Sequence, residues 1–163
     1  MARYWLFKTE PAEYSIADLA GAPGATVRWD GIRNYQARNH LRDEVREGDL
    51  VLVYHSSCKV PGVAGTATVV SAPYPDPSQF DPESPYHDPR SRPDAPRWFC
   101  VDIRHRLSFA SVITTQQLRA MPELADMVLF RQGRLSVQPV TENEWQTIME
   151  LGGVSAPGSA SAT

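Results

Sequence analysis

The proline-rich segment at residues 73–97 constrains the fold more than any other feature of this chain. It holds eight of the 14 prolines, and most of its other residues are polar. Because proline has no amide donor and fixes φ, neither a helix nor a central strand can run through it. We therefore predict a long irregular loop, of a length that in a compact domain is usually mobile or functional.

Short apolar runs alternate with short helical patterns in the rest of the chain. The runs have the length of strands, and Gly65 inside one of them indicates a bulge or a close backbone approach. The predicted strands cover residues 4–7, 49–55, 62–72, 98–109 and 135–140. Helices are predicted after Ser15, over 34–44 and 114–119, and after the capping box Thr141-x-x-Glu144. Regular βαβ spacing is missing, so we predict an α+β fold: a small, partly open mixed β-barrel decorated by short helices.

Two of these elements carry more detailed expectations. In the helix over 34–44, the spacing suggests that Tyr35, Leu41 and Val45 point inward. In the strand over 135–140, Pro139 indicates a position at the edge of the sheet, because proline cannot donate to a neighbouring strand.

Length and charge limit the classes of function. At 163 residues the chain has the size of one domain. Its net charge of −3 excludes a strong non-specific nucleic-acid binder, but it is compatible with a local basic face. No apolar run approaches the ~20 residues of a membrane helix, so no membrane partner is expected. The N-terminus lacks a signal-peptide pattern and the two cysteines are widely separated, which predicts a cytoplasmic protein with reduced thiols.

No residue pattern typical of an enzyme is present. The sequence has no phosphate-binding glycine loop, zincin motif or nucleophile elbow. Cys58 with His55 is the one pair that resembles a nucleophile and its base, and an enzyme acting on nucleic acid would depend on it. We expect no catalytic residue, no metal and no cofactor. The histidines lack the spacing of metal ligands and are expected to be structural or exposed: His40, His55, His87 and His105.

The segment 29–39, WDGIRNYQARN, is the most informative one for function. Trp29 and Tyr35 offer flat apolar faces, Asn34 and Asn39 can donate and accept at once, and Arg33 can pair with phosphate. This combination suits an unstacked base with its phosphate nearby. Asn34 has a second interpretation as the cap of the following helix, and the two roles are compatible. Arg38 and Arg42 lie one turn apart and form either part of the site or a solvated stripe.

Further polar residues follow or line the predicted strands. Lys8 and Ser56 come just after two apolar strands, where binding residues are common, although an ordinary turn explains Ser56 equally well. Trp98 heads another strand and is either a core residue or part of an aromatic cage. Residues spaced by two share one face of a strand. Arg134, Ser136 and Gln138 are therefore predicted to form either the polar wall of a pocket or a solvent-facing edge.

Several of these segments together resemble the EVE domain family. The chain contains in order YWLFKTEP, WDGIRNYQARNHLR, GDLVLVYHSS, PGVAG, YPD, RW and GRLSVQPV. The resemblance covers about residues 2–151 and includes single-domain bacterial members. It implies one domain over 1–151, with the loop 73–97 inside it and 152–163 as a flexible tail. It also implies a PUA-like pseudo-barrel related to the YTH domain, which reads N6-methyladenine in RNA.

The same resemblance implies a pocket for a modified nucleobase, methylated or hydroxymethylated, in DNA or RNA. By analogy with such pockets, Trp29 would be a stacking wall and Trp98 a second aromatic wall. Arg33, Asn34, Tyr35 and Asn39 would line the mouth. The remaining polar contacts would come from Lys8, Ser56, Arg134, Ser136 and Gln138.

Two functions of different classes follow from the sequence. The first is a non-catalytic reader of a modified base in single-stranded or flipped-out form, working with an effector protein. The second is a sensor or carrier of a free small molecule such as a nucleobase metabolite, which the acidic net charge favours because a free base needs no basic track.

Overall fold

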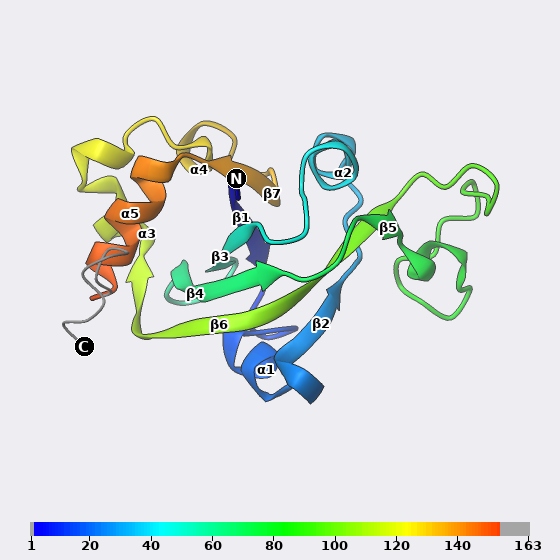
Figure 1. Ribbon diagram of the computed structural model, residues 1–163, viewed down its shortest axis with the longest axis horizontal. Helices are drawn as coiled ribbons and strands as arrows, with labels where there is room; N and C mark the ends of the chain where they lie inside the picture. The colour runs from blue at the N-terminus through cyan, green and yellow to red at the C-terminus, as the bar shows by residue number, and fades with distance from the viewer. Residues whose placement is uncertain (1, 154–163) are drawn as a thin grey trace.

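The computed structural model describes residues 2–153, which form one mixed sheet with short helices around it (Figure 1). The strands are β1 Tyr4–Thr9, β2 Thr26–Trp29, β3 Leu50–His55, β4 Gly62–Val69, β5 Tyr74–Pro75, β6 Phe99–Thr114 and β7 Val137–Val140. The α-helices are α1 Ile16–Gly21, α2 Tyr35–Asp43, α3 Thr115–Arg119, α4 Val128–Arg131 and α5 Glu142–Leu151. Short 3₁₀ turns lie at Pro23–Ala25, Pro77–Phe80 and Pro122–Leu124.

The sheet curls without closing into a barrel. Its strand order is β2-β6-β4-β3-β1-β7, with β5 paired to β6. β1 and β3 run parallel, whereas the other pairs are antiparallel. β2 and β7 are the two ends of this order, so the sheet stays open between them. The predicted edge position of the strand with Pro139 is confirmed.

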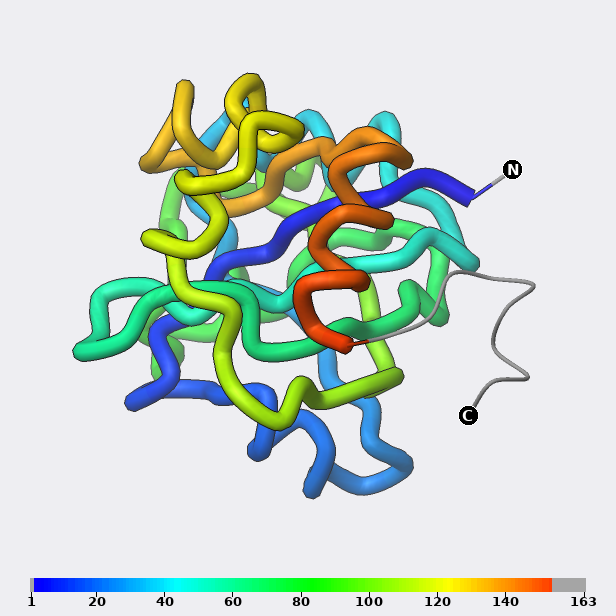
Figure 2. The backbone as a smooth tube through the Cα atoms, turned by 90° about the vertical axis from the view of Figure 1, so that its left-hand side faces the viewer, coloured from blue at the N-terminus to red at the C-terminus, as the bar shows by residue number. Residues whose placement is uncertain are grey.

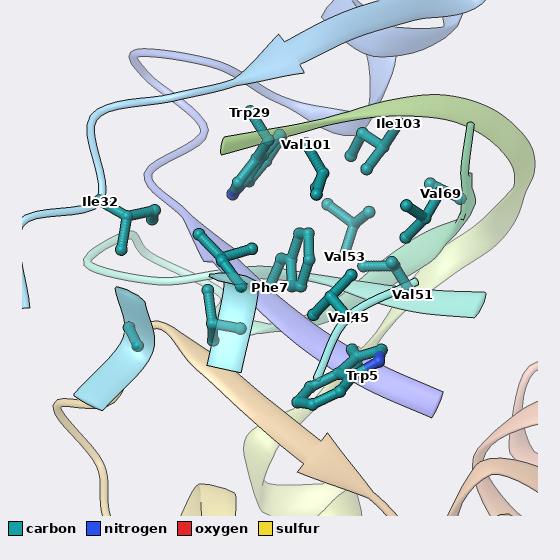
Figure 3. Close-up of a cluster of buried hydrophobic side chains, with 14 of the residues drawn as sticks. Trp5, Phe7, Trp29, Ile32, Val45, Val51, Val53, Val69, Val101 and Ile103 are labelled. Carbon is teal, nitrogen blue, oxygen red and sulfur yellow. The ribbon is translucent and has the colours of Figure 1, made fainter. Parts of the chain in front are cut away.

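Both faces of the central strands are buried, which explains their continuous apolar sequence. In β1, Trp5 and Phe7 point into one core, together with Val51 and Val53 of β3 (Figure 3). The alternate residue Leu6 points into a second core. Helices α3 and α5 lie over this second core at one end of the molecule, facing the viewer in Figure 2.

Local sequence signals set the helix starts. Ser15, Thr114 and Thr141 each close a capping box at the start of α1, α3 and α5. Asn34 accepts a hydrogen bond from the Ala37 amide and thereby caps α2, as its second interpretation required.

The inward direction predicted for Tyr35 is wrong. Leu41 and Val45 are fully buried as expected, but Tyr35 is 51% exposed. It occupies the first position of α2, where its ring stacks on the ring of Trp98 at a centroid distance of 4.7 Å instead of entering the core.

Gly65 marks a place where two strands approach closely. The register between β4 and β6 shifts beside it, and a Cβ at this position would collide with the carbonyl oxygen of Leu107. The predicted bulge or close approach is therefore confirmed.

The proline-rich segment is ordered by buried polar groups rather than by an apolar core. It contains the two-residue strand β5 and one 3₁₀ turn, so the prediction of a wholly irregular loop needs this correction. Gln79 is fully buried; its Oε1 accepts from the amide of Trp98 at 3.1 Å, and its Nε2 donates to the carbonyls of Asp76 and Trp98. The predicted tail lies outside the described residues from position 154 onward.

Candidate nucleic-acid interface

A cavity of about 610 Å³ opens where the sheet fails to close. Residues of β2 line one side of it, and the segment leading into β7 lines the other. The carboxyl ends of the parallel strands β1 and β3 meet at this opening, where the Ser56 amide donates to the carbonyl of Thr9 at 2.9 Å. The amide of Lys8 donates to the carbonyl of Ser136 at 3.0 Å, which brings the segment before β7 to the same place.

Trp29 forms the inner wall of this cavity. It ends β2 and is only 7% exposed, since its ring packs into the first core (Figure 3). The ring of Phe7 lies at a centroid distance of 5.9 Å, and Tyr14 meets it edge-on at 6.3 Å. Trp29 therefore offers the cavity a small part of its surface and gives the rest to the core.

Arg33 ties two segments of the protein together. Its Nε and one Nη donate to the carbonyl of Tyr86 at 3.1 and 2.6 Å, and the same Nη donates to Ser78 Oγ at 3.1 Å. The other Nη donates to the carbonyl of Ile32 and to the carboxylate of Asp76 at 3.1 Å. These five bonds match the five N–H donors of a guanidinium, so Arg33 has none to spare for a phosphate.

Asp76 is the acidic partner that orients the guanidinium of Arg33. Its carboxylate is fully buried and accepts from the amide of Gly31 at 2.9 Å, from Arg33, and from the amide and hydroxyl of Ser78. Burial alone would raise the pKa of Asp76, but these hydrogen bonds outweigh it and hold the pKa below its usual value. The backbone of the loop after β2 is thus fixed to the proline-rich segment.

The cavity carries charges of both signs. Lys8 is half-buried, its Nζ donates to the carbonyl of Gly133, and burial lowers its pKa. Arg28 pairs with Asp30 at 3.1 Å. Within residues 2–153, Arg134 has neither a hydrogen-bond nor an ion-pair partner for its guanidinium, and its side chain is exposed at the rim. Glu10 and Glu13 add carboxylates to the lining.

Seven of the sequence-predicted site residues line this one cavity, although they come from four separate segments. They are Lys8, Trp29, Arg33, Asn34, Ser56, Arg134 and Ser136. The structure places four others elsewhere: Tyr35, Asn39, Trp98 and Gln138.

Packing explains three of these four positions. Trp98 is buried, and its Nε1 donates to the carboxylate of Asp88 at 2.7 Å, which agrees with the alternative of a core residue. Tyr35 covers it from the outside. The Asn39 Oδ1 accepts from Arg38 Nε at 2.9 Å on the outer face of α2.

Gln138 shows that the predicted strand face does not exist. The strand begins only at Val137, so Arg134 and Ser136 belong to a loop and share no strand face with Gln138. Gln138 is fully buried, and its Nε2 donates to the carbonyl of Leu135 at 2.8 Å. It holds the loop that carries Arg134 and does not reach the cavity itself.

Sequence reasoning missed two aromatic residues of the cavity, Tyr14 and Tyr86. Tyr86 lies in the proline-rich segment, which the sequence identified only as a loop. Its one local signal was an aromatic residue among polar and proline neighbours. Tyr14 precedes the cap of α1 and carried no signal of its own.

The candidate nucleophile pair is not assembled. The Nε2 of His55 accepts the amide proton of Ile16 at 3.1 Å at the start of α1, and no hydrogen bond joins His55 to Cys58 in residues 2–153. Over the same residues, no three His, Cys, Asp or Glu side chains gather as metal ligands would. None of the described helices has the length and apolar character needed to cross a membrane.

The stability of the protein is expected to fall as the pH drops below 6.5, partly through His55. Burial lowers the pKa of His55 from 6.5, so the unfolded chain takes up this proton first. The stabilisation from neutral His55 is complete above pH 6.5 and is lost as the pH falls toward the folded-state pKa. Urea unfolding of wild type and His55→Gln at about pH 7.5 and about pH 5.5 measures this. We expect the free energy of unfolding to change less between these two pH values in His55→Gln than in wild type. An equal change in both proteins would contradict this prediction.

Comparison with known proteins identifies close relatives over nearly the whole chain. The EVE domain family model matches residues 3–151. Thymocyte nuclear protein 1 of Homo sapiens is 38% identical over 168 residues, covering 93% of this chain and 74% of that protein. The crystal structure of human THYN1 protein in complex with 5-methylcytosine-containing DNA has 37% identity and a TM-score of 0.89, covering 95% and 100% of the two chains. A hypothetical protein from Leishmania major has 43% identity and a TM-score of 0.90, covering 94% and 96%.

A more distant structure shares the fold alone. The YTH domain of the Zygosaccharomyces rouxii MRB1 protein is 10% identical, with a TM-score of 0.54 over 95% of this chain and 89% of that one. Together with the closer neighbours, it confirms the predicted α+β class, a PUA-like pseudo-barrel with short helices. Because the family model and relatives above 30% identity both span most of its length, the chain belongs to the EVE domain family.

Proposed function

We propose that this protein is a non-catalytic reader that binds a modified nucleobase of DNA or RNA in the cavity between β2 and β7. The observation that carries the proposal is the human THYN1 structure, which was determined with 5-methylcytosine-containing DNA and matches this chain at 37% identity and a TM-score of 0.89. The same family and the same fold favour the same class of ligand.

The size and lining of the cavity support this ligand class. Its volume of about 610 Å³ lies within the usual range of small-molecule sites, roughly 300–1,000 Å³. An aromatic inner wall at Trp29 and polar groups at Asn34 and Ser56 can hold a planar base and contact its edge. Taking a base out of a duplex costs a few kcal/mol, so we infer a preference for single-stranded or mismatched sites.

Phosphate contacts are assigned to Arg134 in place of Arg33. All five donors of Arg33 are used within the protein, whereas Arg134 is exposed at the rim and unpaired among residues 2–153. Lys8 is the second cation that faces the cavity without a carboxylate partner among the described residues. Binding therefore depends on few phosphate contacts.

Fluorescence anisotropy with short single-stranded oligonucleotides tests the proposal. The DNA carries 5-methylcytosine, 5-hydroxymethylcytosine or N6-methyladenine, each with its unmodified twin, and RNA versions separate the two nucleic acids. We expect one modified strand to bind about 10-fold or more tightly than its twin, since a methyl-sized group in a fitted pocket is worth ~1–3 kcal/mol. Equal affinity for every modified strand and its twin would overturn the proposal.

We expect a shallow salt dependence of this binding. With two cations on phosphate, the logarithm of the affinity should fall with the logarithm of salt with a slope of about −1.4, at ~0.7 per contact for single strands. Arg134→Gln should reduce the slope by about 0.7. Arg131→Gln changes an exposed arginine three residues away, outside the cavity, and serves as the control. An unchanged slope in Arg134→Gln would contradict the phosphate assignment.

Two observations favour the alternative function, a sensor or carrier of a free nucleobase metabolite. The net charge is −3, and the guanidinium of Arg33 is bonded within the protein instead of being free for a phosphate. Free modified nucleoside binding as tightly as the oligonucleotide would favour this alternative. For the reader, we further propose an effector protein that converts binding into a response.

A further inference from the structure

Tyr86 is the most exposed of the aromatic residues that line the cavity. Trp29 is 7% exposed, because most of its ring packs in the core, and Tyr14 is half-buried. Tyr86 is 40% exposed and lines the cavity from the proline-rich segment. Building on the proposed function, we infer that Tyr86 forms the outer aromatic wall of the cavity and stacks on the bound base.

The backbone of the loop after β2 forms the seat of the Tyr86 ring. A Cβ at Gly31 would lie 2.7–2.9 Å from three atoms of this ring, so the ring rests directly on the glycine. Gly31 has φ +80°, a conformation that other residues rarely adopt. Because Gly31 lies two residues after Trp29, one short loop joins the inner aromatic wall to the glycine on which the outer wall rests.

The main chain of Tyr86 is fixed as well. Its carbonyl accepts two hydrogen bonds from Arg33, and the guanidinium carbon of Arg33 lies 5.6 Å from the ring centroid. Asp76 in turn holds Arg33 and the amide of Gly31. The ring is therefore positioned before a ligand arrives, which lowers the entropic cost of binding.

The ring face, and not the hydroxyl, makes the contact. Tyr86→Phe removes the hydroxyl and keeps the ring face, so it separates these two contacts. An aromatic face accepts any base, so stacking raises affinity without reading the modification. The wall at Tyr86 thus serves modified and unmodified bases alike, and the discrimination arises deeper in the cavity.

The experiment compares Tyr86→Ala, Tyr86→Phe and wild type on the 5-methylcytosine strand and its unmodified twin. We expect Tyr86→Ala to weaken both by a similar factor, about 5- to 150-fold, with the ratio between them unchanged. Tyr86→Phe should stay within about twofold of wild type, because the ring face remains. His87→Ala removes the neighbouring exposed ring, which does not line the cavity, and is the matched control.

A second variant tests the seat of the ring without removing it. Gly31→Ala displaces the Tyr86 ring, and adding Tyr86→Ala to it should then cost little further affinity. Thermal unfolding of each variant shows whether the fold is kept, and Tyr86→Phe keeps the test valid if Gly31→Ala or Tyr86→Ala is destabilised.

The outcomes separate this inference from the proposed function. If Tyr86→Ala binds like wild type while wild type prefers the modified strand, the inference is overturned and the reader stands. If Tyr86→Phe loses as much as Tyr86→Ala, stacking is overturned. If wild type shows no preference for any modified strand, the proposed function fails, whereas a loss of affinity for both strands in Tyr86→Ala would still support the stacking wall.

Discussion

Replacing Trp29 with alanine is expected to destabilise the protein by about 3–5 kcal/mol, the usual range for a buried aromatic residue in a core. Trp29 is 7% exposed and packs against Phe7 and Tyr14 inside the first core, so its removal leaves a void that rigid strands cannot fill. Urea unfolding followed by circular dichroism measures the loss. Trp29→Phe keeps an aromatic ring and should lose clearly less.

The control for this prediction is Val60→Ala, at a position 50% exposed, where a change within about 0.5 kcal/mol is expected. An unfolding midpoint of Trp29→Ala equal to that of wild type would show that the ring contributes nothing to the core. Lost ligand binding in Trp29→Ala would report lost folding as much as a lost contact, so Trp29→Phe is the informative variant for binding.

Replacing Asp76 with alanine is the second large effect that we expect, about 3–5 kcal/mol of lost stability, because breaking a buried ion pair leaves its partner uncompensated. The carboxylate is fully buried, and Arg33 is only 22% exposed. The amide of Gly31 and the hydroxyl of Ser78 lose their acceptor as well. Ligand binding should weaken in parallel, since this carboxylate fixes the loop on which Tyr86 rests.

Asp76→Asn and Asp94→Ala complete this test. Asparagine keeps one acceptor oxygen and should lose less stability than alanine. Asp94 is an exposed acid of the same segment, with a side chain 75% exposed, so its change should stay within about 0.5 kcal/mol. If Asp76→Ala unfolds at the same urea concentration as wild type, the buried ion pair between Arg33 and Asp76 does not contribute to the stability of the fold.

The pH dependence of unfolding in acid tests the contribution of the Asp76 carboxylate independently. The folded-state pKa of Asp76 is lowered, so its stabilisation is complete above the ordinary value of 3.8 and is lost as the pH falls through the folded-state pKa. Asp76→Asn has no such proton to bind. Its unfolding free energy should therefore depend less on pH than that of wild type below about pH 4.

Local elements of this fold could be predicted from the sequence because their causes are local. Ser15 and Thr141 start helices through hydrogen bonds to residues three positions away. Gly65 indicates a bulge because it has no side chain to prevent the close approach of two strands. Leu6 and Leu52 belong to continuous apolar runs, since their strands are buried on both faces. Pro139 predicted an edge strand from its own missing donor.

The error at Tyr35 has a physical reason as well. Helical spacing states which residues share a face, but at the first position of a helix the chain has not yet entered the core. The neighbouring Trp98, 63 positions later in the sequence, offered the ring a stacking partner outside it. The prediction that Arg134, Ser136 and Gln138 share a strand face failed for a similar reason. Residues spaced by two share a face only within a strand, and β7 begins at Val137.

What the sequence by itself determined is the fold class, most of the longer elements and the segments that carry the candidate site; it did not predict β2, β5 or α4. Only the tertiary structure decided which side chains are available to a ligand. Arg33 looked free for phosphate until Asp76, 43 positions away, and the carbonyl of Tyr86, 53 positions away, were found to use its donors. Tyr86 faces the cavity because its ring rests on Gly31. Such contacts depend on how distant segments pack against each other, and the local order of residues does not encode which distant partner each side chain will meet.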